Sequence, residues 1–228
     1  MSDTRTNAGV DNVFKYRKLF TWEVPGDRFI TIQTAGNLAT TQSVISLLDE
    51  RSKAPEDRKP SLMEVPTMFQ VAQLVGNTLK EVIRTQGPDG PAGESQFGAT
   101  LIVGGQIRDM EPRVFLVYPE GNFVEASDET PFLQIGETKY GRPIILRAFR
   151  PEMTFEEAVK LLYVSFDSTL KANLSVGMPL DLQVYHKNTL KTGEYRRIEE
   201  NDPYFSAISS RWGDALQLAF NSLPDYHF

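Results

Sequence analysis

Residues whose side chains could do chemistry gather in two short segments near the start of the chain. These are Ser2–Gly9 (SDTRTNAG) and Thr34–Gln42 (TAGNLATTQ), with the stretch Tyr16–Phe20 (YRKLF) between them. They hold carboxylate, hydroxyl, lysine and glycine residues, types that serve acid–base and nucleophilic chemistry. Taken singly, each type has an ordinary role in a turn or on a strand surface. A functional interpretation therefore depends on their joint spacing.

Composition and missing motifs exclude several other chemistries. The chain has no Cys, which removes disulfides, thiolate nucleophiles and most zinc sites together. Of its two His, we expect His186 on a strand surface and His227 in the tail. The acidic clusters Glu156-Glu157 and Glu199–Asp202 are predicted to be solvated helix caps, because the helix dipole favours carboxylates there. The sequence contains no nucleophile elbow, P-loop, dinucleotide fingerprint or HExxH motif.

Charge and hydropathy limit the classes of partner that the protein can bind. The net charge of −6 and the pI of about 5.1 argue against nucleic acid, because binding to phosphates needs clusters of Lys and Arg. Apolar runs such as Ile144–Leu146 and Leu161–Val164 are far shorter than the roughly 20 residues that cross a bilayer. Met1-Ser2-Asp3 opens no signal peptide. We therefore expect a cytoplasmic protein with no nucleic-acid or membrane partner.

Alternation, turn residues and helix caps predict the order of elements. Strands are expected at 13–24, 28–34, 99–107, 113–118, 122–125, 132–135, 180–186 and 194–198. Helices are expected from a cap at Asn37 to 51, from Pro66 to 83, at 141–148, from the capping box Thr154–Glu157 to 170, and at 204–220. The segment Gly87–Gly93 is expected to be a loop.

Paired strands followed by paired helices predict the layering. The order ββ, αα, ββββ, αα, ββ, α suggests two stacked sheets with a helix layer on each outer face, because each amphipathic helix must cover a sheet. The helix after Thr154 would bury a stripe through Ala158, Leu162 and Phe166. No low-complexity stretch divides the chain, so residues 1–228 are expected to form one domain.

The two opening segments and the strand between them resemble the proteasome β-subunit family. In that family an S/A-D-x-R-x-x-x-G turn, a Lys on the next strand and an A-G loop before the first helix surround a reactive threonine. SDTRTNAG, Lys18 and Ala35-Gly36 match this pattern. The segment Ile135–Pro143 (IGETKYGRP) is similar to the bacterial Anbu (ancestral β-subunit) branch. The resemblance runs from Ser2 onward and implies an α+β fold, the four-layer αββα sandwich of N-terminal-nucleophile hydrolases.

The resemblance also implies a role for each matching residue. Asp3 and Lys18 would form a buried charge pair beside the nucleophile, and Arg5 would brace their turn. The backbone N–H of Gly36 would be the oxyanion donor, and Ser175 would hydrogen-bond the amine. An N-terminal threonine uses its own α-amine as base, because an amine with a pKa of about 8 keeps a useful neutral fraction near pH 7. A nearby lysine lowers that proton affinity further.

Three departures from the family pattern bear on these roles. Where the family has R-D-x-x-S-G-G, the sequence reads Lys171–Gly177 (KANLSVG), so Ala172 replaces the acid while Ser175 remains. Gly136-Glu137-Thr138 replaces a G-S-G and puts a carboxylate near the expected site. The family also has a β-hairpin of about 15 residues, beginning with the reactive threonine, ahead of the Asp3 turn. We therefore expect the printed chain, which lacks the first β-hairpin, to be inactive.

Three functions stay open on the sequence alone. The first is a proteasome-type threonine peptidase that cleaves peptides or unfolded proteins inside a homo-oligomer, either a ring or an open spiral. The second is a non-catalytic assembly or scaffold subunit of the same fold. The third is an amidase of the N-terminal-nucleophile group that acts on a small amide. None of the three calls for a cofactor or a metal ion.

Overall fold

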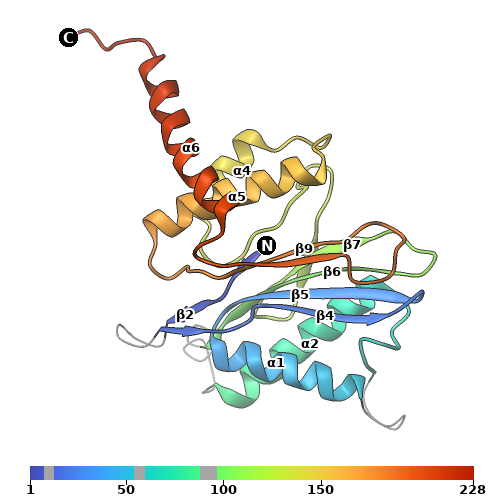
Figure 1. Ribbon diagram of the computed structural model, residues 1–228. Helices are drawn as coiled ribbons and strands as arrows, with labels where there is room; N and C mark the ends of the chain where they lie inside the picture. The colour runs from blue at the N-terminus through green and yellow to red at the C-terminus, as the bar shows by residue number, and fades with distance from the viewer. Residues whose placement is uncertain (8–12, 54–59, 88–96) are drawn as a thin grey trace.

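Two β-sheets lie one above the other between two layers of helices (Figure 1). This computed structural model describes residues 1–7, 13–53, 60–87 and 97–228. The strands are β1 Ser2–Asp3, β2 Arg5–Asn7, β3 Val13–Lys15, β4 Leu19–Val24, β5 Arg28–Gly36, β6 Ala99–Ile107, β7 Arg113–Val117, β8 Phe123–Glu125, β9 Leu180–Val184 and β10 Glu194–Ile198. The larger sheet has the antiparallel order β4-β5-β6-β7-β8, the smaller has the order β1-β9-β10, and β2 pairs with β3.

Helices cover the outer faces of both sheets. They are α1 Leu38–Ser52, α2 Met68–Gln86, α4 Arg142–Ala148, α5 Phe155–Ala172 and α6 Pro203–Asn221. Helices α1 and α2 lie on the larger sheet, α4 and α5 lie over the smaller one, and α6 leaves the layers (Figure 1). Asn37 caps α1, and Thr154 forms the predicted capping box with Glu157 at the start of α5. The predicted α+β class and αββα layering are confirmed.

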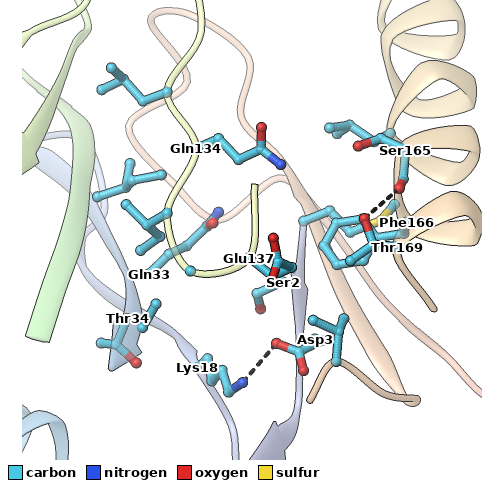
Figure 2. Close-up of a pocket in the computed structure, with 18 of the residues that line it drawn as sticks. Ser2, Asp3, Lys18, Gln33, Thr34, Gln134, Glu137, Ser165, Phe166 and Thr169 are labelled. Carbon is cyan, nitrogen blue, oxygen red and sulfur yellow. Dashed lines mark hydrogen bonds and ion pairs between the residues drawn. The ribbon is translucent and has the colours of Figure 1, made fainter. Parts of the chain in front are cut away.

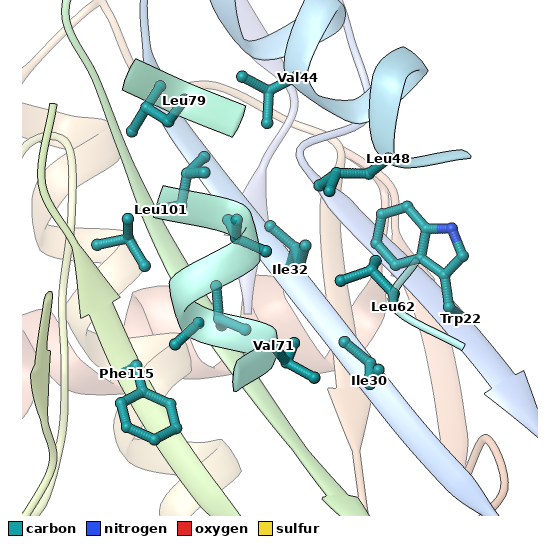
Figure 3. Packing of buried hydrophobic residues seen from close by; sticks show 14 of the residues in the cluster. Trp22, Ile30, Ile32, Val44, Leu48, Leu62, Val71, Leu79, Leu101 and Phe115 are labelled. Carbon is teal, nitrogen blue, oxygen red and sulfur yellow. The ribbon is translucent and has the colours of Figure 1, made fainter. Parts of the chain in front are cut away.

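The main core fills the space between the larger sheet and its two helices. Ile30 and Ile32 on β5, Leu101 on β6, and Val71 and Leu79 on α2 are fully buried there (Figure 3). Side chains alternate along a strand, so the β5 residues on the face opposite to Ile30 and Ile32 point toward the smaller sheet. The strand that anchors the core therefore also supplies side chains to the space between the sheets.

The predicted hairpin is confirmed only in its inner part. Strand β4 pairs with β5 from Leu19 opposite Gln33 to Val24 opposite Arg28. The prediction of one continuous strand over 13–24 is wrong: residues 13–15 do form a strand, but it pairs with β2, and residues 16–18 lie outside any strand. Lys18 is thereby placed in a break between two strands, where its side chain is free to turn toward β1.

The predicted helix start at Pro66 is also wrong. Helix α2 begins at Met68, because the Thr67 hydroxyl accepts the backbone N–H of Gln70 at 3.2 Å and so occupies the capping position. Proline therefore precedes the cap instead of following it. The predicted loop Gly87–Gly93 lies, apart from its first residue, outside the described residues.

Residues 132–135 form an extended loop, not the predicted strand. Their side chains border the cavity described below, and the Phe132 ring packs against that of Phe149 with centroids 5.9 Å apart. Helix α5 differs in a similar way: its predicted stripe Ala158, Leu162 and Phe166 borders the same cavity and is only half-buried. Apolar periodicity identifies the side that faces inward, but a cavity there leaves that side incompletely covered.

Two polar residues differ from their predictions, one in its position and the other in its burial. His186 follows β9 by two residues instead of lying on a strand, and its ring meets that of Phe155 edge-on at 4.9 Å. Asp202 does cap α6, accepting the Phe205 amide at 2.8 Å, but its carboxylate is buried against Arg196. The prediction of a solvated cap is therefore wrong for Asp202, because the ion pair with Arg196 compensates its burial.

Candidate active site

A cavity of about 720 Å³ opens between the two sheets and helix α5 (Figure 2). Its walls come from β1, the end of β5, the loop 132–137 and one side of α5. The structure brings all five predicted site residues to this cavity, although they come from four separate parts of the chain. They are Asp3, Arg5, Lys18, Gly36 and Ser175.

The Asp3 carboxylate ties three segments together at one end of the cavity. Its Oδ1 accepts from Lys18 Nζ at 2.8 Å (Figure 2). Its Oδ2 accepts the backbone N–H groups of Arg5 at 3.1 Å and Gly177 at 3.2 Å. The side chains of Asp3 and Lys18 are 12% and 20% exposed, so solvent screens their attraction only in part. The pair predicted by the resemblance is present.

Hydrogen bonds hold both the side chain and the backbone of Lys18 in place. Its ammonium also donates to the Arg5 carbonyl, and its own carbonyl accepts the Thr34 N–H at 2.9 Å. The hydrogen bonds that Arg5 makes in this turn therefore run through its backbone. Its side-chain stem packs close to Gly177, where a Cβ would stand 2.7 Å from Arg5 Cδ. A charged ammonium is thus held rigidly at the edge of the cavity.

Gly36 ends β5 in a conformation that favours glycine. Its φ is +112°, and a Cβ at this position would stand 2.6 Å from the Gly98 carbonyl oxygen. Ala35 pairs with Thr100 and Gly36 with Ala99, so the larger sheet holds this backbone until α1 begins. A backbone N–H at such a rigid strand end is suited to stabilising an oxyanion, because its position is set before any substrate binds.

Ser175 lies on the turn after α5 and is linked through Asn173 to Glu137, a carboxylate that the sequence left without a role. The Ser175 N–H donates to Asn173 Oδ1 at 2.8 Å, and Asn173 Nδ2 donates to Glu137 Oε2 at 2.7 Å. Glu137 Oε1 in turn accepts the Lys139 N–H at 2.8 Å. Ala172 is the last residue of α5. The carboxylate at this turn therefore comes from the loop 132–137 instead of from α5.

Two buried oxygens at the cavity have no hydrogen-bond partner among the described residues. They are Ser2 Oγ and Gln134 Oε1, which lie in the walls formed by β1 and the loop 132–137. Buried polar atoms are rarely left unpaired, so the cavity presents unmet hydrogen-bonding capacity. Burial also lowers the pKa of the Met1 α-amine at this wall to about 6, although the Asp181 carboxylate opposes the shift. With that pKa, the Met1 α-amine is largely neutral at pH 7.

Sequence reasoning missed the polar residues that α5 contributes. Ser165 and Thr169 are buried, and the Thr169 hydroxyl donates to the Ser165 carbonyl at 2.9 Å (Figure 2). A Cβ on Gly141 would stand 2.3 Å from Ser165 Oγ, so glycine allows α4 to approach α5 here. The sequence pattern that could have identified them is a pair of hydroxyl residues four positions apart on an otherwise apolar helix face. Gln134 carried no comparable signal.

No group of three His, Cys, Asp or Glu side chains in the described ranges is placed to hold a metal ion. None of the helices within these ranges is long and apolar enough to span a membrane. The side chains that line the cavity include the Lys18 ammonium, the carboxylates of Asp3 and Glu137, and several hydroxyls.

Comparison with known proteins places this site in a family. A family model described as Proteasome subunit matches residues 23–184, more than half of the chain. The chain belongs to the proteasome subunit family. The proteasome subunit beta 2 of Pyrobaculum calidifontis is 26% identical over 170 residues, which are 73% of this chain and 74% of that relative.

Solved structures narrow the assignment to the Anbu branch of proteasome subunits. Anbu from Yersinia bercovieri is 44% identical with a TM-score of 0.91, and the match covers all of this chain and 94% of that one. Anbu from Hyphomicrobium sp. strain MC1 is also 44% identical over the same shares, with a TM-score of 0.92. A helical Anbu assembly from Pseudomonas aeruginosa is 45% identical, with a TM-score of 0.91, and the match covers 99% of this chain and 92% of that one. The resemblance drawn from the Asp3 turn, Lys18 and Gly36 is confirmed.

Proposed function

We propose that this Anbu-type chain is the subunit of a threonine peptidase that cleaves peptide bonds inside a homo-oligomer in the cytoplasm. The observation that carries the proposal is the Asp3–Lys18 pair at 2.8 Å, which stands at the edge of a 720 Å³ cavity together with Gly36. A charged lysine held beside a cavity lowers the proton affinity of a neighbouring amine. The helical assembly of the Pseudomonas aeruginosa protein supports an oligomer.

In this proposal the nucleophile is the first threonine of a β-hairpin that leads into Ser2 and packs in the cavity. Two buried oxygens without partners, Ser2 Oγ and Gln134 Oε1, support a strand at this place, because a strand offers backbone N–H donors.

The expected reaction divides into two acyl-transfer steps. The threonine hydroxyl gives its proton to its own α-amine as the oxygen attacks the peptide carbonyl. The Gly36 N–H stabilises the resulting oxyanion, and such a donor contributes roughly 3 kcal/mol. The amine then passes the proton to the leaving nitrogen, which leaves an ester. Water hydrolyses this ester by the same route and restores the free threonine. The positive charge of Lys18, which is paired with Asp3, lowers the proton affinity of the amine.

The test starts from the protein expressed from its own locus with its native upstream DNA. Its intact mass and N-terminal sequence are measured, and the protein is then treated with an epoxyketone, a probe that reacts with a free N-terminal threonine. A leading threonine and a covalent adduct that is lost in Lys18→Met support the peptidase. A protein without an adduct contradicts it and favours the scaffold subunit. Cleavage of glutamine-like or γ-glutamyl amides alone, with no cleavage of a peptide library, favours the small-amide amidase.

A further inference from the structure

The two stacked sheets do not share a hydrophobic core (Figure 1). One cluster of buried apolar residues lies between the larger sheet and helices α1 and α2, and another lies between the smaller sheet and helices α5 and α6. Among the described residues, none belongs to both clusters. Each sheet and its helices thus form a body with its own core, and the contacts between the sheets fix how the two bodies stand. Hydrogen bonds fix such a position more narrowly than apolar contacts, because they are directional.

Gln183 on β9 makes the contact near the middle of the sheets. Its Oε1 accepts the Thr31 hydroxyl at 2.9 Å, and its Nε2 donates to Thr21 Oγ1 at 3.0 Å. Thr21 and Thr31 stand opposite each other on β4 and β5. One side chain of the smaller sheet is therefore bound to two strands of the larger sheet, and a sideways shift of either sheet would break at least one of these bonds.

Gln106 on β6 makes the contact at the end of the sheets away from the cavity. Its Oε1 accepts the Tyr185 hydroxyl at 2.6 Å and the Asn188 N–H at 2.8 Å. Its Nε2 donates to Asn188 Oδ1 at 2.7 Å and to the Met110 carbonyl at 2.6 Å. Gln106 is only 1% exposed, so its amide makes all four of its possible hydrogen bonds inside the protein. The Tyr185 ring also stacks on Phe29 of β5, with centroids 4.3 Å apart.

The backbone is unusual at this same contact. Among the described non-glycine residues, a positive φ occurs only at Asn188 (+68°), Leu190 (+48°) and Asp109 (+63°). The first two follow β9, and the third lies in the turn after β6 that Gln106 joins to them. A positive φ is uncommon for a bulky residue such as leucine, and strain of this kind persists where the surrounding contacts demand one position.

The groups proposed for the reaction belong to different sheets. Asp3 lies on β1 of the smaller sheet and holds the Gly177 N–H of the segment that leads into β9. Gly36 ends β5 of the larger sheet. Lys18 connects the two, because its carbonyl accepts the Thr34 N–H of β5 while its ammonium meets Asp3. The distance between the Asp3 turn and the Gly36 N–H is therefore set by the spacing of the sheets.

We propose that Gln106 and Gln183 are positioning residues, which fix the spacing of the two sheets and so the distance from the Asp3 turn to the Gly36 N–H. They act at the far end and at the middle of the sheets, whereas the reaction takes place at the cavity end. The effect on catalysis rests on the proposed peptidase function, but the effect on spacing does not.

A distance measurement within one copy tests the spacing. The chain has no Cys, so Ser46→Cys on α1 and Leu174→Cys after α5 can carry spin labels at two exposed positions, one on each body. Double electron–electron resonance is recorded on labelled protein diluted with an excess of unlabelled protein. In Gln106→Leu and in Thr31→Val, the width of the distance distribution should grow at least about twofold, because a directional contact is lost. Thr31→Ser keeps the hydroxyl and should match wild type.

Thr78→Val is the matched control, since it makes the same chemical change inside one body. The Thr78 hydroxyl is buried and accepts from Arg51 at 2.7 Å, which joins α2 to α1. This variant should melt at a lower temperature, as Thr31→Val does, but should leave the distance distribution unchanged. Equal broadening in the control, or no broadening in Gln106→Leu and Thr31→Val, would overturn the proposal.

The catalytic effect is measured in the active protein with its upstream hairpin. In Gln106→Leu and Thr31→Val, kcat should fall at least about tenfold, because a displacement of about 1 Å between reacting groups is enough for such a loss. Thr31→Ser should keep the wild-type kcat. An unchanged kcat in variants whose distribution broadens contradicts the positioning role. Should the wild type show no peptidase activity, the proposed function fails, and the distance distributions alone decide whether these residues fix the spacing.

Discussion

The Asn173 side chain donates to the Glu137 carboxylate at 2.7 Å and so joins the loop 132–137, a wall of the cavity, to the turn that carries Ser175. Neither residue belongs to the charge pair of Asp3 and Lys18, yet Glu137 borders the same cavity. The link makes Glu137 a positioning residue for Ser175 in the proposed reaction.

Glu137→Ala should lower the peptidase rate of the active protein by about tenfold, because a misplaced hydrogen bond at a reacting group costs on the order of 1.4 kcal/mol. Glu137→Gln retains an oxygen that can accept from Asn173 and should keep most of the activity. The measurement is kcat and KM for a peptide substrate, and the loss should fall on kcat. Equal losses in both variants, or a loss confined to KM, would show that Glu137 does not position Ser175.

The Asp3–Lys18 pair should couple in stability as well as in activity. Asp3→Asn leaves a half-buried ammonium without its carboxylate, which costs about 2–4 kcal/mol of unfolding free energy. Lys18→Met should cost a similar amount, because the buried carboxylate then loses its cation. The double variant should lose less than the sum of the two, which urea denaturation of all four proteins measures as a coupling energy. Additive losses would mean that the two charges do not interact.

Gly36→Ala should destabilise the chain through both its backbone angle and a steric contact. Gly36 has a positive φ of +112°, and a Cβ at this position would stand 2.6 Å from the Gly98 carbonyl oxygen. Together these predict that the free energy of unfolding falls by about 2–4 kcal/mol. Gly26→Ala is the matched control: Gly26 also has a positive φ, +75°, but a Cβ there meets nothing within 4 Å. The Gly26→Ala variant should lose only about 1 kcal/mol of unfolding free energy. Similar melting temperatures for the two variants would contradict the steric contact.

The Glu23–Thr192 contact should make stability depend on pH in the acid range. The Thr192 hydroxyl donates to Glu23 Oε2 at 2.6 Å, and this bond, with a further one from the Thr192 N–H, lowers the pKa of Glu23 below its usual value. The contact therefore adds to the free energy of unfolding above about pH 4.3, the pKa of a glutamate in the unfolded chain. This contribution is lost as the pH falls through the lower pKa of Glu23 in the folded protein. Since Glu23 is exposed, the contribution is below about 1 kcal/mol.

Glu23→Gln should therefore narrow the difference in unfolding free energy between pH 6 and pH 3 relative to wild type. Glu120→Gln, in an exposed turn, is the control and should follow the wild-type curve. Denaturant titrations at several pH values provide the measurement. An unchanged difference in Glu23→Gln would show that the contact with Thr192 does not favour the ionised carboxyl group.

The sequence by itself determined the layering, most element positions and the family. Periodic apolar residues with strong caps, such as Asn37 for α1 and Thr154 with Glu157 for α5, are local signals, because the groups that satisfy a helix start lie within four residues. The spacing of Asp3, Lys18 and Gly36 was informative for a different reason: it matches the pattern of the proteasome β-subunit family, whereas local chemistry alone placed Lys18 inside a continuous strand.

Only the tertiary structure decided what these elements enclose. Nothing local distinguishes the loop 132–135 from a strand, because a cavity wall and a sheet face produce the same alternation. The link between Glu137 and Asn173, the unpaired oxygens of Ser2 and Gln134, and the solvent exposure of α6 depend on contacts between residues far apart in the chain, or on their absence. Periodicity tells which side of an element is apolar, whereas the packing of other elements decides whether that side meets a core, a cavity or another molecule.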